Sequence, residues 1–311
     1  MLYKNIVSPA DVYPVWGSTA AGLTKKFILF CLMITLQLLP ARADSPFNQG
    51  KLIATGGVTQ VEGTGGSGLT NWALITGYGT DKGIGINAHH TVALLNDFTF
   101  NSSGIAVGLY DRVELSYAHQ WFDTRDAGAR LGIGEGFTFD QDIIGAKVRL
   151  IGNAVYDQDS LIPQISVGAN YKKNGDQALV RALGARNDDS YDLYISATKI
   201  ILDQSLILNA TARYTEANQF GLLGYGSATS GHTLQTEVSL SYLFTPDIVA
   251  GIDFRTKPDN LAFAKEQDAM AVYLAYFFSK NLSVTIAGVD LGDIALQGRQ
   301  RGFYLSLQAG F

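Results

Sequence analysis

Cysteine, proline and charged residues are all scarce in this chain of 311 residues. Its single cysteine excludes a disulfide framework and a cysteine-rich zinc site. Charged residues make up 16% of the chain, against about 25% in an ordinary globular domain. The net charge of −5 argues against a protein that binds nucleic acid by neutralising phosphates. Disorder is excluded as well, because 47% of the residues are hydrophobic and only seven are proline.

Long apolar runs are also missing, apart from one near the N-terminus that has the pattern of an export signal. Lys25 and Lys26 precede this run, residues 27–39, and an Ala-x-Ala cleavage site ends at Ala43. The run is shorter than the roughly 20 residues that a membrane-spanning helix needs. We predict that residues 1–43 are an N-terminal extension and a cleaved signal peptide, with Cys31 inside it. The alternative is a membrane anchor or a buried helix.

Beyond this segment, apolar and polar residues alternate with the period of β-strands. Val238, Leu240 and Tyr242, for example, alternate with Ser239 and Ser241. The pattern predicts twelve strands, at about 69–79, 97–110, 113–122, 143–156, 161–172, 190–202, 205–216, 234–244, 248–256, 268–278, 282–291 and 302–311. The preceding residues 44–68 are glycine-rich, and we leave open a periplasmic extension, a plug in the lumen or an extra hairpin.

The predicted connections alternate between short turns and long polar loops. With an even number of antiparallel strands, all short turns fall at one end and all long loops at the other. This asymmetry is typical of bacterial outer-membrane barrels. We therefore predict an all-β fold, a closed antiparallel transmembrane β-barrel of about twelve strands (about 10–14), formed by residues 69–311. A secreted or periplasmic β-sandwich shares the alternation and is the alternative.

The C-terminal strand favours the membrane barrel. Its last residues alternate and end in an aromatic side chain, which resembles the signal read by the barrel-assembly machinery. The residues of this predicted assembly signal are Phe303, Leu305, Leu307, Ala309 and Phe311. An open sheet edge in lipid would leave backbone groups unpaired at several kcal/mol each, so the last strand must pair with the first.

Charges on the polar faces of the strands are predicted to point into the lumen, because an arginine or lysine in lipid at mid-depth costs about 2–4 kcal/mol. These residues are Glu114, Lys147, Arg149, Lys172, Asp192, Arg213, Glu237, Asp253 and Arg255. Two interpretations remain open. The charges line a polar pore and select solutes, or they form paired ions that fill a narrow barrel.

Signals for chemistry are weak. The Gly63–Gly68 segment matches G-x-G-x-x-G, yet a predicted strand follows it where a dinucleotide site needs a helix. His89 and His90 are neighbours in a predicted loop, and His119 lies on the apolar face of a strand with Ser116 pointing the other way. We predict no catalytic residues, no metal site and no cofactor, so the chain is not expected to be an enzyme.

Several longer motifs carry a family resemblance. They are residues 54–63 (ATGGVTQVEG), 68–73 (GLTNWA), 145–150 (GAKVRL), 208–213 (LNATAR), 217–224 (ANQFGLLG) and 257–261 (KPDNL) with Lys265 and Glu266. Over residues 50–311 the chain resembles the bacterial family named domain of unknown function 3034. The resemblance implies an exported, barrel-forming protein without an assigned activity.

These observations predict a protein of the outer membrane of a Gram-negative bacterium, most simply a passive channel for small polar solutes. One alternative is a structural or interaction barrel with a filled lumen, and a remote one is a barrel lipid hydrolase using His119. The expected partners are outer-membrane lipid, the barrel-assembly machinery at the C-terminal strand and a small polar solute, but not nucleic acid.

Overall fold

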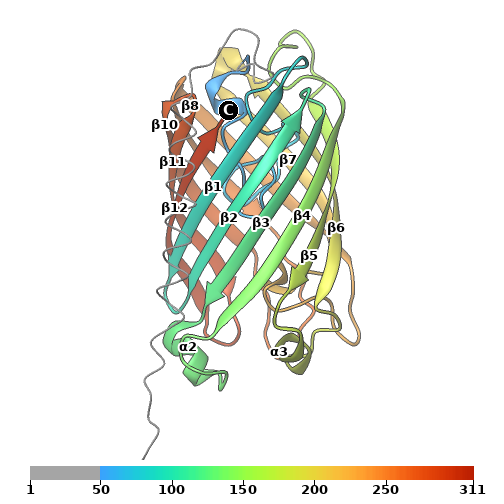
Figure 1. The fold of residues 1–311 in the computed structure, drawn as a ribbon, viewed down its shortest axis with the longest axis vertical. Coiled ribbons are helices and arrows are strands. Elements are labelled where there is room, and N and C mark those ends of the chain that lie inside the picture. The colour runs from blue at the N-terminus through green and yellow to red at the C-terminus, as the bar shows by residue number, and fades with distance from the viewer. Residues whose placement is uncertain (1–49) are drawn as a thin grey trace, which may run out of the picture. The chain divides into compact units, whose positions relative to one another are not determined.

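Twelve antiparallel strands close into a barrel in the computed structural model, which describes residues 50–311 (Figure 1). The strands are β1 (Ile84–Leu95), β2 (Thr99–Leu109), β3 (Val113–Asp123), β4 (Thr138–Ile151), β5 (Gln164–Asn174), β6 (Asp189–Ile201), β7 (Leu206–Thr215), β8 (Thr233–Thr245), β9 (Ile248–Arg255), β10 (Ala269–Ser279), β11 (Leu282–Asp293) and β12 (Arg299–Gly310). Each strand pairs with its neighbours in sequence, and β1 pairs with β12. The predicted closed barrel is confirmed. The predicted signal peptide lies outside the described residues.

The outer face of the barrel is apolar because the strands alternate. In β10, Met270, Val272 and Leu274 are exposed on the outside while Ala271 and Tyr273 are buried inside. The same pattern runs around the barrel, and a water-facing surface of this kind would be unstable. A bilayer is the solvent that fits it, so the fold is a transmembrane β-barrel. No helix among residues 50–311 is long and apolar enough to cross a membrane.

The two ends of the barrel differ. The turn end carries the connections 110–112, 152–163, 202–205, 246–247 and 280–281, including the 3-10 turn η2 (Leu202–Gln204). The loop end carries the connections 96–98, 124–137, 175–188, 216–232, 256–268 and 294–298. The loop end also holds the short helices α2 (Arg125–Arg130) and α3 (Gln177–Ala182) and the 3-10 turn η3 (Asn218–Gly221). The predicted asymmetry is present, except that the β1–β2 connection is short and the β4–β5 connection is long.

The first strand was predicted in the wrong place. Residues 69–79 form no barrel strand, and β1 instead occupies residues 84–95, where the sequence suggested a polar loop. His89 and His90 misled the prediction, because one points into the lumen and the other outward, so neither face reads as purely apolar. The barrel therefore begins at Ile84 rather than at residue 69.

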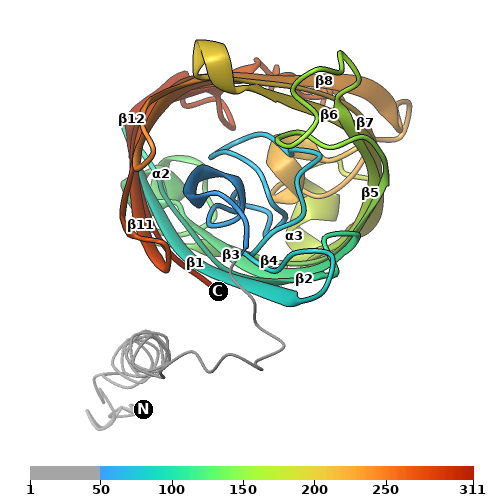
Figure 2. The same cartoon turned by 90° about the horizontal axis from the view of Figure 1, so that it is seen from above.

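Residues 51–80, here called the inner segment, run inside the barrel (Figure 2). Most of them are buried, including Trp72 and Tyr78. Apart from the 3-10 turn η1 (Ile53–Thr55) and two isolated bridges, the segment has no regular backbone pairing. The inner face of β10 is apolar because Ala275 and Phe277 pack in one cluster with Trp72.

The first prediction tests the outer face. Leu274→Arg places a charge near the middle of β10 on the lipid side, and we expect it to lower the stability of the folded barrel by about 2–4 kcal/mol. The matched control is Leu161→Arg, because Leu161 is 98% exposed in the β4–β5 connection. Urea unfolding in lipid vesicles measures both variants. Equal stability of the two would contradict the membrane-facing assignment.

Candidate functional site

The charged side chains of the barrel wall bind the inner segment. Glu114 and Lys147 are fully buried and lie 3.1 Å apart on the neighbouring strands β3 and β4. The Glu114 carboxylate accepts hydrogen bonds from the backbone N–H groups of Gly65 and Thr76 at 2.9 and 2.8 Å. The Lys147 ammonium donates to the carbonyl oxygens of Gly65, Trp72 and Leu74. This pair therefore holds two separate stretches of the inner segment together.

A second cluster surrounds Glu62, an acid of the inner segment. Its carboxylate lies 2.8 Å from Lys172 Nζ, 2.7 Å from Arg213 Nη1 and 2.6 Å from Arg255 Nη2. Asp192 lies 2.8 Å from both Lys172 and Arg213, so it shares two of these cations.

Glu237 completes the central network, which comprises Glu62, Lys172, Asp192, Arg213, Glu237 and Arg255. Its carboxylate accepts from Arg213 Nε at 2.7 Å and from the backbone N–H of Asn71 at 2.7 Å. The six charges balance as three acids and three bases. A balanced, hydrogen-bonded cluster is the arrangement that makes burial of several charges tolerable, because each lost hydration shell is replaced by partners.

The other two predicted lumen charges also have partners. Asp253 accepts hydrogen bonds from the Ser67 hydroxyl at 2.7 Å and from the Leu69 backbone at 3.0 Å. Arg149 lies apart from the network, next to the turn end, where it pairs with Asp111. The same carboxylate lies 2.6 Å from the ammonium of Lys51 at the start of the inner segment.

The central network joins the inner segment to η3, which folds inward from the loop end. Gln219 and Phe220 in η3 have left-handed backbone angles, φ 45° and 64°, a strained state for non-glycine residues. The Glu266 carboxylate accepts a hydrogen bond from the backbone N–H of Gln219 at 3.1 Å. The Lys257 ammonium donates to the side-chain oxygen of Gln219 at 2.9 Å. The Arg255 guanidinium lies 4.5 Å from the centre of the Phe220 ring. These contacts fix η3 above the network.

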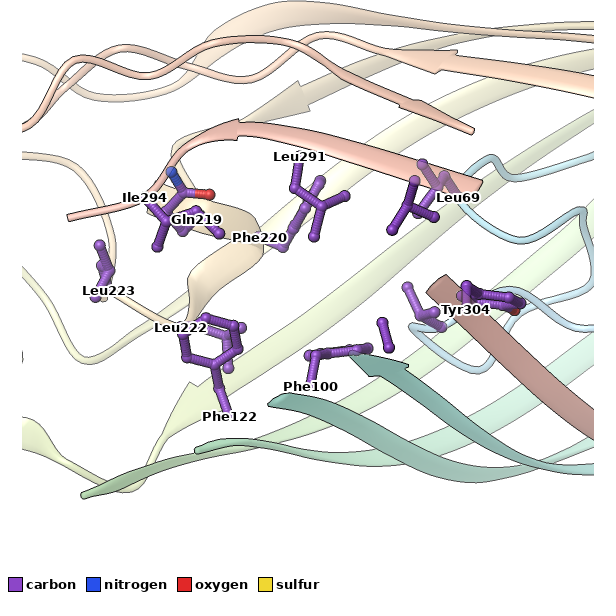
Figure 3. A pocket seen from close by; sticks show the side chains of 13 residues that line it. Leu69, Phe100, Phe122, Gln219, Phe220, Leu222, Leu223, Leu291, Ile294 and Tyr304 are labelled. Carbon is purple, nitrogen blue, oxygen red and sulfur yellow. The ribbon is translucent and has the colours of Figure 1, made fainter. Parts of the chain in front are cut away.

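Above the network, part of the loop half of the lumen is apolar, although the buried Lys257–Glu266 pair also lies there. A cavity of about 40 Å³ is surrounded by side chains from both the barrel wall and η3, including Phe100, Phe122, Phe220 and Leu291 (Figure 3). Leu69 of the inner segment also lines it. The lumen thus changes from ionic and polar at mid-depth to apolar below the loops.

The histidines form no metal site. Among residues 50–311, no group of three or more histidine, cysteine, aspartate or glutamate side chains is arranged to hold an ion. His89 points inward, where its Nδ1 lies 2.9 Å from the Thr59 hydroxyl and its Nε2 lies 3.1 Å from Ser102. It helps to hold the inner segment.

His119 faces outward, as expected, but with a neighbour that the sequence did not reveal. Its Nδ1 lies 2.9 Å from Asp142 on β4, one residue before the strand that the sequence predicts at 143–156. On the same outer face, the hydroxyl of Ser103 is hydrogen-bonded to His90, 2.8 Å from its Nδ1. Ser103 is also the cross-strand partner of His119 in the register of β2 and β3.

The predicted assembly signal lies at alternate positions of β12, so its members from Phe303 to Ala309 share one face. Phe303 and Leu305 are exposed outward, and Leu307 is half-buried on the same face. Ala309 is buried. Phe311 follows the strand, and its carbonyl oxygen accepts from the backbone N–H of Ile86 at 2.9 Å. Recognition of this strand by assembly machinery stays a prediction.

This geometry defines a transmembrane β-barrel whose lumen is occupied by its own N-terminal segment. The family described as "Protein of unknown function (DUF3034)" matches residues 55–308, so the chain belongs to that family. The match includes most of the inner segment as well as the barrel. No curated protein matches the chain.

Solved structures share the barrel shape at low identity. The structure titled "KdgM porin" has 13% identity and a TM-score of 0.47, covering 73% of this chain and 99% of its own. A Salmonella typhi outer membrane phospholipase has 10% identity and a TM-score of 0.44, covering 84% and 98%. The COG4313 outer membrane channel from Pseudomonas putida F1 has 13% identity and a TM-score of 0.41, covering 73% and 93%. Similarity at this level carries no argument about activity.

No periodic pattern in the sequence marks Glu62 as a lumen residue. It lies in an irregular, glycine-rich stretch that has no strand alternation to show where a side chain points. The only available signal was an acid within a segment otherwise nearly free of charge. The predicted lumen side chains include one more base than acids, so an additional acid inside the lumen would balance their charge.

The second prediction concerns Glu62. Glu62→Gln removes the negative charge shared by Lys172, Arg213 and Arg255, and we expect a loss of about 3–5 kcal/mol in the free energy of unfolding. The control Glu135→Gln lies in an exposed loop and should change stability little. Chemical unfolding followed by circular dichroism measures both. An effect below 1 kcal/mol, on the order of an exposed ion pair, would rule out the central network as a structural anchor.

The third prediction concerns the Lys257–Glu266 pair in the β9–β10 connection. Burial raises the pKa of Glu266 to about 7, although the Lys257 ammonium opposes this change. The folded protein therefore holds a proton that the unfolded chain releases near pH 4.5, and stability should fall as the pH rises from about 4.5 to 7. Glu266→Gln should flatten this dependence in thermal unfolding scans. An unchanged slope in the variant would contradict the assignment.

Proposed function

We propose that this protein is a channel of the Gram-negative outer membrane that its inner segment holds closed. The apolar outer face supports the membrane location, and short turns at one end with long loops at the other fit periplasmic and extracellular sides. In this proposal the C-terminal strand engages the assembly machinery. The passing solute is small, because a twelve-stranded barrel is narrower than the open porins of 16–18 strands.

The observation that carries the proposal is how the inner segment is bound. It is held by side-chain contacts and not by strand pairing, so it can be released without breaking the barrel ladder. When it moves, Lys172, Arg213 and Arg255 would face an aqueous lumen, alternating with Asp192 and Glu237 along the consecutive strands β5 to β9. Charges of both signs at a constriction select small polar solutes.

The second candidate is a structural or interaction barrel with a permanently filled lumen. It is favoured by the number of wall charges already used in ion pairs and backbone contacts with the inner segment, such as Glu114 and Lys147. Under this alternative, the same contacts serve stability alone. The two candidates differ in whether the segment ever leaves its place.

The fourth prediction separates them. Ser67 of the inner segment and Ser239 of β8 have hydroxyl oxygens 3.5 Å apart, so a cysteine pair there can lock the segment to the wall. We expect rare openings for the unmodified chain in planar bilayers and at least ten-fold more for Glu62→Gln. Adding Ser67→Cys and Ser239→Cys to that variant should abolish the openings under oxidising conditions, and a reductant should restore them.

The control for this experiment is Glu135→Gln with the same cysteine pair, which should conduct as rarely as the unmodified chain. If Glu62→Gln folds into vesicles and shows no openings at any voltage, the filled-barrel candidate replaces the channel. If its openings persist with the disulfide formed, the inner segment is not the gate.

A further inference from the structure

The loop end encloses a second and larger cavity, here called the roof chamber, of about 230 Å³. Every loop-end connection contributes to its lining, through Phe98, Thr124, Leu183, Leu223, Phe263 and Ile294. A gap between two elements is a common packing defect, but this space is built by six separate connections. Its shape therefore depends on the whole loop end being assembled.

The lining of the roof chamber is aromatic and aliphatic apart from one side chain. Its single polar side chain is Thr124, whose hydroxyl already donates to the Phe137 carbonyl oxygen at 2.7 Å. The rings of Phe98 and Phe122 are 4.8 Å apart, and both line the chamber. A polar solute would lose its hydration there without gaining a partner, whereas an apolar solute would gain by leaving water.

The volume sets the size of the occupant. An apolar cavity of about 150 Å³ in another protein binds benzene, so about 230 Å³ accommodates a molecule with one or two rings. Backbone strain supports a defined shape, because Ala295 and Leu296 in the lining have positive φ angles of 46° and 68°. Such angles persist where surrounding structure holds them in place.

The roof chamber also leads toward the inner segment. It shares Phe122, Leu223 and Ile294 with the smaller cavity of Figure 3, which reaches Val61 and Leu69 of that segment. Apolar surface is thus continuous from the loops to the part of the lumen that the segment closes.

We propose that the roof chamber is a binding site for a small apolar molecule with one or two rings. The direction of any onward passage rests on the proposed channel function, but binding itself does not need the inner segment to move. The inference names an apolar ligand class, where the lumen charges alone suggest polar solutes.

The test uses the full chain in lipid nanodiscs with 1-fluoronaphthalene as the probe and ¹⁹F NMR as the readout. We expect saturable binding by the unmodified protein, and none by 2-deoxy-2-fluoroglucose used as a polar comparator. Ile133→Trp fills the chamber from the β3–β4 connection and should weaken binding at least ten-fold. Leu161→Trp, exposed at the opposite end, corrects for tryptophan and lipid partitioning and should leave binding unchanged.

A second filling variant, Leu183→Trp in a different connection, guards against misfolding of the first. The proposal is overturned if binding is not saturable, if both filling variants bind as tightly as Leu161→Trp, or if the sugar competes with the naphthalene. Glu62→Gln should keep the binding. Binding without any bilayer openings would sink the channel alone, and openings without binding would sink the roof chamber alone.

Discussion

The structure depends on one requirement, which is that the backbone of the inner segment be hydrogen-bonded inside a barrel. The irregular segment satisfies only some of its N–H and C=O groups internally, such as Trp72 N–H with the Gly65 carbonyl, and groups left unpaired in a buried lumen cost free energy. The wall supplies the partners as charged side chains, with Glu114 accepting from two amides and Lys147 donating to three carbonyls. Charges that look like a pore lining in the sequence therefore act as a receptor for the segment.

This requirement also divides the lumen into layers. Ionic contacts gather at mid-depth around Glu62, and η3 lies above them with Phe220 against Arg255. Beyond η3 the side chains around the two cavities are mostly apolar, while the buried Lys257–Glu266 pair bonds the backbone of Gln219 and Leu291. No residue of the inner segment lines the roof chamber, whereas Val61 and Leu69 line the smaller cavity beside it.

The barrel was predictable because its strands obey a strict period of two. Eleven of the twelve strands and the inward charges follow from that period and from the cost of placing charge in lipid, whereas β1 does not. The course of residues 51–80 was not predictable, because its contacts are to side chains scattered over many strands. The burial of Trp72 and Tyr78 depends on contacts that no local pattern encodes.

The same limit applies to β1 and to the outer face. His89 and His90 serve opposite sides of one strand, so a single face never reads as apolar. Asp142 lies beside His119 only through the register between β3 and β4, which the sequence does not show. Strands whose own sequence alternates were predicted. Contacts that depend on the register between neighbouring strands were not.

Hydrogen exchange of the inner-segment amides tests the central claim most directly. The account predicts that the N–H groups of Gly65, Leu69, Asn71 and Thr76, each bonded to a wall carboxylate, exchange as slowly as those of the barrel strands. Exchange of these four amides at the rate of the exposed β4–β5 connection would contradict it, because the inner segment would then not be held in the lumen.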